Sequence, residues 1–154
     1  MCYICLLYTS AAHEVFFIGR GIDYAISMEG SLKLKEISYI HSEAYAAGEL
    51  KHGTISLIEE GTLVAAVLTQ KDLYKKMISN MVEVSTRGAF VLAVTNEGND
   101  EVERAADYVI YIPETNKFFA NSLAIIPLQM CIRDRSSRAQ KMVIRNWKKR
   151  KSLS

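Results

Sequence analysis

The chain has 154 residues, of which 49% are hydrophobic, with 19 basic and 17 acidic side chains and a formal net charge of +2. The length predicts one ordinary domain that is large enough to bury a hydrophobic core. The apolar stretch at residues 1–7 is too short to span a bilayer and has no basic lead-in, so we expect neither a membrane helix nor a signal peptide. No internal repeat or low-complexity tract is present.

Two hexapeptides set the ends of the chain apart from the rest. Cys5–Ser10 (CLLYTS) is the translation of the bases TGTCTCTTATACACATCT. Met130–Arg135 (MCIRDR) matches their reverse complement in another frame, which encodes MCIRD and a first base that fits the codon for Arg135. Those bases resemble a transposon-end adapter used in making sequencing libraries. We therefore predict that residues 1–10 are adapter-derived, that 11–129 form the domain, and that 130–154 are adapter-derived sequence followed by an unrelated basic tail.

The net charge of the predicted domain differs from that of the whole chain. Residues 11–129 hold 10 basic and 16 acidic side chains, a net charge of −6, and the basic run at 148–151 lies outside them. We therefore expect no nucleic-acid partner. All three cysteines (Cys2, Cys5 and Cys131) also lie in the ends, so the domain can form neither a disulfide framework nor a thiolate metal site. This pattern fits a reducing, cytoplasmic setting.

The predicted elements alternate between strands and helices. Short apolar runs predict strands at residues 15–18, 63–68, 90–94 and 108–112. Helical periodicity and end signals predict helices at 24–39, 71–86 and 116–129, with Pro127 a late irregularity, and a helical turn at 101–106. This order predicts an α/β fold, a parallel, flavodoxin-like doubly wound sheet with helices on both faces. Ligands of such sheets bind outside the carboxyl ends of the strands, which here points to the substrate-binding loop Gly19, Arg20 and Gly21.

The first predicted helix carries a charged stripe. Glu29, Lys33 and Glu36 are spaced i, i+4, i+7 and fall within about 60° of one another. Apolar or small residues flank the stripe on both sides: Ile26, Gly30, Leu34 and Ile37 on one, Ala25, Met28, Leu32 and Tyr39 on the other. The arc expected to face solvent holds Ser27, Ser31, Lys35 and Ser38.

Two interpretations of this stripe remain open from spacing alone. Charges between apolar flanks are partly desolvated, which is the environment that tunes general acid–base groups. The alternative is an ordinary Glu–Lys pair on a helix surface, worth a few tenths of a kcal/mol, and spacing by itself favours it.

The following segment, Ser42–Gly53, shifts the balance toward catalysis. It places Glu43, Glu49, Lys51 and His52 among small residues, and its glycines permit close backbone approach. His52 lies in a turn that we expect to be exposed, and His41 is a weaker candidate. No His or Cys spacing typical of a metal site is present, nor is a Gly-rich phosphate-binding or dinucleotide-binding motif, so no metal and no cofactor are predicted.

The block Glu29–Gly53 (EGSLKLKEISYIHSEAYAAGELKHG) is long and specific. With FFIGRG before it and TISLIEEGT after it, this stretch resembles the second sugar-isomerase (SIS) lobe of the glutamine–fructose-6-phosphate aminotransferases, a similarity that runs over about residues 14–129. The resemblance implies an SIS-type fold and the ketose–aldose isomerisation half of the reaction that makes glucosamine 6-phosphate from fructose 6-phosphate and glutamine in hexosamine biosynthesis. It also implies a homodimeric parent enzyme.

The resemblance also implies roles for four residues. Glu36 would be the base that moves a proton between C2 and C1 of the open-chain sugar, and His52 would assist ring opening at the site of the neighbouring subunit. Lys33 would position the sugar hydroxyls or shuttle their protons, and Glu29 would hold Lys33. Such an isomerisation needs a carboxylate near a carbon-bound proton and polar groups for the shifting oxygen charge. We expect the stripe to lie near the Gly19–Gly21 loop, at the carboxyl edge of the sheet.

The chain also departs from the family pattern. Nothing in it corresponds to the glutaminase domain, to the first SIS lobe that supplies most Ser/Thr contacts to the sugar phosphate, or to the terminal tail with its Schiff-base lysine. We therefore expect this chain to be inactive by itself. Two alternatives are another isomerase or deglycase of the SIS superfamily, against which the block Glu29–Gly53 argues, and a non-enzymatic module that binds a phosphosugar. A module of the second kind would need neither Glu36 nor His52.

Overall fold

The computed structural model describes residues 14–136, apart from the side chains of 117, 118 and 131–136. The predicted adapter-derived residues 1–10 and most of the basic tail lie outside this range. The described part contains a five-stranded parallel sheet in the order β2-β1-β3-β4-β5, which is the order of flavodoxin-like doubly wound folds. The predicted fold class is confirmed. The strands are β1 (Glu14–Gly19), β2 (His41–Ala46), β3 (Leu63–Leu68), β4 (Phe90–Asn96) and β5 (Tyr108–Ile112).

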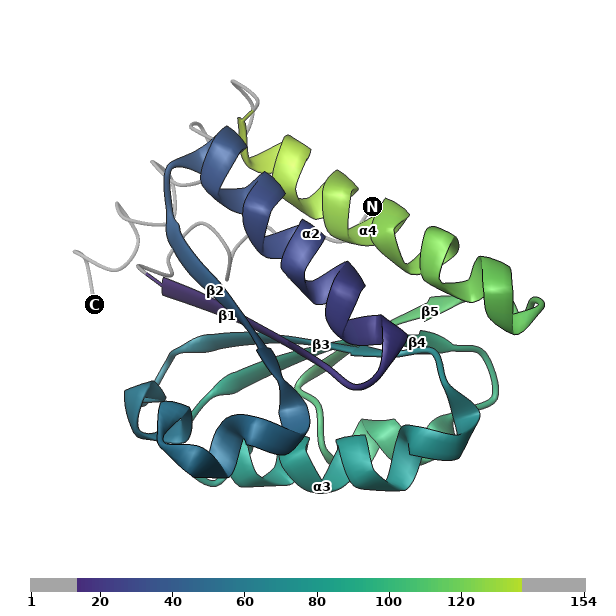
Figure 1. Ribbon diagram of the computed structural model, residues 1–154, viewed down its shortest axis with the longest axis horizontal. Helices are drawn as coiled ribbons and strands as arrows, with labels where there is room; N and C mark the ends of the chain where they lie inside the picture. Colours follow the sequence, from purple (N-terminus) through teal and green to yellow (C-terminus); the bar gives the residue numbers. More distant parts are fainter. Residues whose placement is uncertain (1–13, 137–154) are drawn as a thin grey trace, which may run out of the picture.

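Helices cover both faces of the sheet. Figure 1 shows α2 (Ile22–Ser38) and α4 (Lys117–Ser136) side by side on one face, with α3 (Tyr74–Ser85) on the other. The α3 face also carries the 3-10 turns η1 (Ala47–His52) and η2 (Thr54–Leu57). Two further 3-10 turns, η3 (Lys71–Leu73) and η4 (Asp100–Arg104), precede α3 and β5.

The core is divided into two halves by the alternation of strand side chains. In β1, Phe16 and Ile18 pack toward α3, whereas Val15 and Phe17 pack toward α2 and α4. Every residue of β3 is buried, as its unbroken apolar run predicts for a strand covered on both faces.

The sequence analysis missed one strand, β2. Its residues, HSEAYA, form no apolar run, because β2 is an edge strand that is only partly covered. It pairs with β1 alone, from Glu14 opposite His41 to Gly19 opposite Ala46. Periodicity detects buried faces, so it does not detect a polar edge strand held by backbone hydrogen bonds.

The last helix extends further than predicted. The sequence predicts an end at residue 129, but α4 continues through Pro127 to Ser136. A proline inside a helix removes one backbone hydrogen bond. Packing offsets this loss, since Ala120, Ala124 and Leu128 are buried against the rest of the domain.

Candidate functional site

The charged stripe lies on one face of α2, as predicted. The Nζ of Lys33 donates a hydrogen bond to Oε2 of Glu36 at 2.9 Å and lies 3.8 Å from Oε1 of Glu29. One ammonium group therefore bridges two carboxylates that lie one turn before and one turn after it on the helix.

The stripe is a surface feature in this chain. The hydrogen bond to Glu36 and its negative charge raise the pKa of Lys33, and the charge of Glu29 adds to the effect. The side chains of Lys33, Glu29 and Glu36 are 33%, 39% and 50% exposed. Water screens ion pairs at such exposure, so these pairs stabilise the fold little. The stripe is therefore less enclosed than the sequence predicts.

The reason is that α2 is rotated relative to the expected orientation. Ser27 and Ser31, expected to face solvent, are fully buried. The hydroxyl of Ser42 lies 3.0 Å from that of Ser31 and donates to the Ser31 carbonyl oxygen at 2.9 Å. Small hydroxyl groups that bond to their neighbours allow α2 to approach β2 closely, and Met28 and Leu32, which flank the stripe, are left exposed.

The expected position of Glu36 near the Gly19–Gly21 loop is wrong. The helix starts at Ile22, directly after that loop, and its rise of about 1.5 Å per residue carries Glu36 about 21 Å away along the axis. Just beyond the helix, His41 begins β2 opposite the first residue of β1. Glu36 therefore lies toward the amino edge of the sheet, because a helix between parallel strands returns the chain to the edge at which strands begin.

The loop itself is packed against the protein's own side chains. Nε2 of Gln70 donates to the carbonyl oxygen of Arg20 at 2.7 Å. A Cβ at Gly21, whose φ is +56°, would lie 2.9 Å from that amide nitrogen, and one at Gly19 would lie 2.5 Å from the Asp23 carbonyl oxygen. The backbone contact therefore requires a glycine at position 19, and the positive φ favours one at position 21. The role of the three loop residues in substrate binding stays a prediction, and of the three only Arg20 lines a cavity described below.

A buried polar network lies behind the loop. Asp23 accepts the backbone N–H of Thr69 at 2.8 Å and its hydroxyl at 2.5 Å. Burial raises the pKa of Asp23, and the hydrogen bonds from Thr69 oppose this rise. The Thr69 hydroxyl also lies 3.0 Å from the side-chain amide of Asn121 on α4. The Asp23 carboxylate thus binds the residue that follows β3 beside the end of β1, where sheets of this order commonly bind a ligand.

His52 lies apart from the α2 stripe. It is the last residue of η1, which packs on the α3 face of the sheet, whereas α2 covers the opposite face. Its side chain is 75% exposed, as expected for the turn, and its Nε2 lies 3.7 Å from Oε2 of Glu49. The structure therefore brings together the three charged residues of α2 but not His52.

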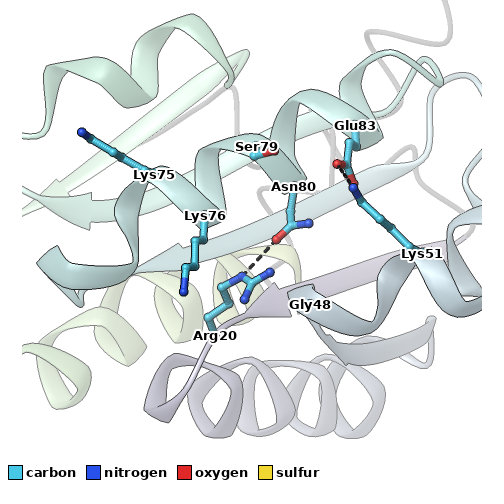
Figure 2. Close-up of a pocket in the computed structure, with 8 residues that line it drawn as sticks. All are labelled: Arg20, Gly48, Lys51, Lys75, Lys76, Ser79, Asn80 and Glu83. Atoms are coloured by element: carbon cyan, nitrogen blue, oxygen red, sulfur yellow. Dashed lines mark hydrogen bonds and ion pairs between the residues drawn. The ribbon is translucent and has the colours of Figure 1, made fainter.

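A cavity of about 440 Å³ lies on the α3 face of the sheet, and Arg20 is the one lining residue that the sequence analysis had assigned to a binding site. Figure 2 shows it between Arg20, η1 and one face of α3. The α3 residues that line it include Lys76, Ser79, Asn80 and Glu83. Their i, i+3, i+4, i+7 spacing is the same signal that marked the stripe on α2, so periodicity could have found them.

The described residues contain neither a cluster of metal-binding side chains nor a membrane-spanning helix. Between residues 14 and 136, no three His, Cys, Asp or Glu side chains lie close enough to hold a metal ion. Over the same range, no helix combines the length and apolarity needed to cross a membrane.

Comparison with known proteins gives the class of the chain. The SIS domain family matches residues 8–134, and the chain belongs to this family. Its fold also resembles that of the Vibrio vulnificus NanR protein complexed with ManNAc-6P, with a TM-score of 0.72 over 94% of this chain and 57% of the other. At 15% identity, this likeness concerns the fold alone.

Within the family, the sequence matches one kind of enzyme. It is 61% identical over 117 residues to the glutamine–fructose-6-phosphate aminotransferase of Caldanaerobacter subterraneus subsp. tengcongensis, and 57% identical over 122 residues to that of Clostridium tetani. The matches cover 76% and 79% of this chain but 19% and 20% of those proteins, so the chain spans about a fifth of their length.

A solved structure gives the same match. The C-terminal domain of glucosamine-fructose-6-phosphate aminotransferase from Francisella tularensis aligns with a TM-score of 0.75 at 37% identity, over 82% of this chain and 36% of that one.

Proposed function

We propose that this chain is the second SIS lobe of a glutamine–fructose-6-phosphate aminotransferase and carries part of its isomerase site. The observation that carries the proposal is the bridge from Lys33 to Glu29 and Glu36, within a segment that matches these enzymes closely. The substrate would be fructose 6-phosphate, and the reaction would be the isomerisation that ends in glucosamine 6-phosphate, in a cytoplasmic, hexosamine-forming enzyme.

In this proposal Glu36 is the base that moves a proton between C2 and C1 of the open-chain sugar. A carboxylate can do so once the carbon-bound proton is within hydrogen-bond reach. The ammonium of Lys33, 2.9 Å away, orients that carboxylate and offers a positive charge to the oxygen on which negative charge develops. Glu29 holds Lys33 from the preceding turn.

The exposure of the stripe requires a second surface to complete the site. Acid–base groups act more strongly when water is excluded from them. Met28 and Leu32 are exposed on the same side of α2, which supports the docking of another surface there. We assign that surface to the first SIS lobe of the parent, which would also bind the phosphate.

His52 would serve a different copy of the site. Its place on the α3 face, across the sheet from α2, supports a role at the sugar bound by the neighbouring subunit of a homodimer. There it would assist opening of the fructose 6-phosphate ring, while a separate glutaminase domain of the parent would supply ammonia.

The test is a substitution in the full-length parent. We expect Glu36→Gln to lower the isomerase rate about 10²-fold or more, the usual contribution of a positioned acid–base group. Glutamine hydrolysis should continue, because it takes place in another domain. Both half-reactions are assayed for Glu36→Gln and for Glu60→Gln, an exposed glutamate away from the stripe. Unchanged isomerisation in the Glu36 variant would overturn the assignment.

A further inference from the structure

The cavity on the α3 face gathers positive charge in an otherwise acidic domain. Four cationic side chains line it, Arg20, Lys51, Lys75 and Lys76, against one carboxylate, Glu83. Residues 11–129 as a whole carry a net charge of −6, from 10 basic and 16 acidic side chains. Clustered positive charge inside a concave surface raises the local concentration of anions.

Three of these cations form no ion pair within the described residues. Lys51 pairs with Glu83, at 2.7 Å between Nζ and Oε1, which accounts for the one carboxylate. Arg20 bonds to the neutral Asn80, and no carboxylate of residues 14–136 pairs with Lys75 or Lys76. The cavity therefore keeps an excess of positive charge that the fold itself does not neutralise.

The Arg20 guanidinium is fixed in position by the protein, and its terminal N–H groups can bind a ligand. Its Nε donates to Oδ1 of the buried Asn80 at 3.1 Å, and its backbone carbonyl oxygen accepts from Gln70 at 2.7 Å. The terminal nitrogens are directed past Gly48, where a Cβ would lie 3.3 Å from each of them. A fixed guanidinium with free terminal N–H groups matches the geometry of a phosphate group.

Lys76 adds a second cation at this end of the cavity. Figure 2 shows that the Lys76 side chain extends from α3 toward Arg20, whereas the Lys75 side chain points away from Arg20. Arg20 and Lys76 are therefore the two cations placed to share one anionic group. The volume of about 440 Å³ exceeds what a single phosphate needs and lies in the range of small-molecule sites.

The crevice between β1 and β3 does not offer an alternative place for an anion. The Asp23 carboxylate already accepts the backbone N–H and the hydroxyl of Thr69 there. A second negative group would meet like charge. Arg20 follows β1 directly, yet its side chain lines the cavity on the α3 face.

We propose that this cavity binds the phosphate group of a phosphorylated metabolite, at a site separate from the stripe on α2. Arg20 and Lys76 contact the phosphate, and the remaining volume takes the organic part. The two sites lie on opposite faces of the sheet, so this proposal does not depend on the catalytic role of Glu36.

The experiment is calorimetric titration of the 154-residue chain with three probes: inorganic phosphate, fructose 6-phosphate and uridine monophosphate. We expect saturable binding of phosphate that weakens as sodium chloride is added. Tighter binding of the sugar phosphate or of the nucleotide identifies the organic part, and either result supports the site. The absence of saturable binding by all three probes overturns it.

Three variants test whether phosphate binds in the cavity on the α3 face. Lys76→Met should weaken phosphate binding about tenfold, the usual effect of one lost charge-assisted contact. Gly48→Ala should also weaken it, because the added methyl group crowds the guanidinium. Lys35→Met, which removes an exposed cation from α2 on the other face, should leave binding unchanged. Equal affinity in the Lys76 and Lys35 variants, with both folded by circular dichroism, overturns the proposal.

Discussion

A single buried carboxylate organises the carboxyl edge of the sheet. Asp23 lies in the first turn of α2 and accepts two hydrogen bonds from Thr69, which follows β3. The Thr69 carbonyl oxygen in turn accepts from Asn96 at 3.0 Å. One side chain thus links the ends of neighbouring strands to the start of a helix. This link requires the burial of the Asp23 carboxyl group.

This burial predicts how stability depends on pH. The pKa of Asp23 is raised by burial, so the folded state holds the proton to a higher pH than the unfolded chain does. Between the two pKa values the folded state binds more protons, and the free energy of unfolding falls as pH rises through that window. Asp23→Asn keeps an oxygen acceptor for the Thr69 N–H but does not titrate, so it should lose this dependence.

Urea unfolding of the two proteins at a series of pH values from about 4 to 8 measures the difference. Asp72→Asn, at an exposed position on η3, is the matched control and should retain the dependence of the original chain. An Asp23→Asn profile parallel to that of the original chain would show that this carboxyl does not titrate in the window.

At the scale of elements, α2 illustrates how one helix divides its faces. Asp23, Ser27, Gly30, Ser31 and Leu34 are buried, whereas the charged stripe and the apolar residues on one side of it, Met28 and Leu32, face outward. The helix ends at Tyr39, whose φ of +55° lies in the left-handed region and whose side chain is 92% exposed. A tyrosine therefore occupies a capping position that favours glycine.

We expect Tyr39→Gly to stabilise the chain. The left-handed conformation costs an L-residue about 1–2 kcal/mol, and glycine adopts it freely at an entropic cost of about 0.5–1 kcal/mol. The net gain should be up to about 1 kcal/mol in the free energy of unfolding. Chemical denaturation of Tyr39→Gly is compared with that of Tyr39→Ala, which removes the same side chain but keeps the strain. A gain that is equal in both variants would place the effect in the side chain.

In the molecule as a whole, the two helices α2 and α4 expose several large apolar side chains. Ile22, Met28 and Leu32 on α2 are exposed, and so are Phe119, Ile126 and Met130 on α4. The two helices lie side by side over one face of the sheet (Figure 1). A surface of this kind supports the proposal that the lobe works within a larger assembly.

It follows that this chain alone should not make glucosamine 6-phosphate from fructose 6-phosphate, even with ammonia supplied. Its proposed base is half exposed, and the 154 residues span about a fifth of the length of the relatives. Positioning supplies roughly 7–11 kcal/mol of barrier reduction in favourable cases, and this chain lacks most of it. A coupled assay for glucosamine 6-phosphate checks this, and robust synthesis by the 154-residue chain would show that the site is misassigned.

A further prediction concerns the ends of the chain. We expect the natural gene to depart from this sequence before Ala11, where the first adapter-like hexapeptide ends, and after Gln129, where the second begins. Sequencing the parent locus across the codons for Ser10 and Met130 decides the matter. A locus that reads straight through both hexapeptides would show that they are native.

Features that depend on short-range pattern could be predicted from the sequence. The unbroken apolar runs of β1 and β3, and the spacing that puts Glu29, Lys33 and Glu36 on one helix face, follow from the fixed geometry of strands and helices. The specific amino-acid sequence of Glu29–Gly53 predicted the family to which the comparisons assign the chain.

The orientation of each helix and strand, and the residues that it contacts, depend on packing between distant segments. The rotation of α2 depends on the hydroxyl contact between Ser31 and Ser42, and β2 exists because β1 offers it a backbone edge. The cavity forms where Arg20 meets α3, sixty residues further along the chain. Such contacts join distant segments, and their energies depend on desolvation and fit, which local periodicity does not encode.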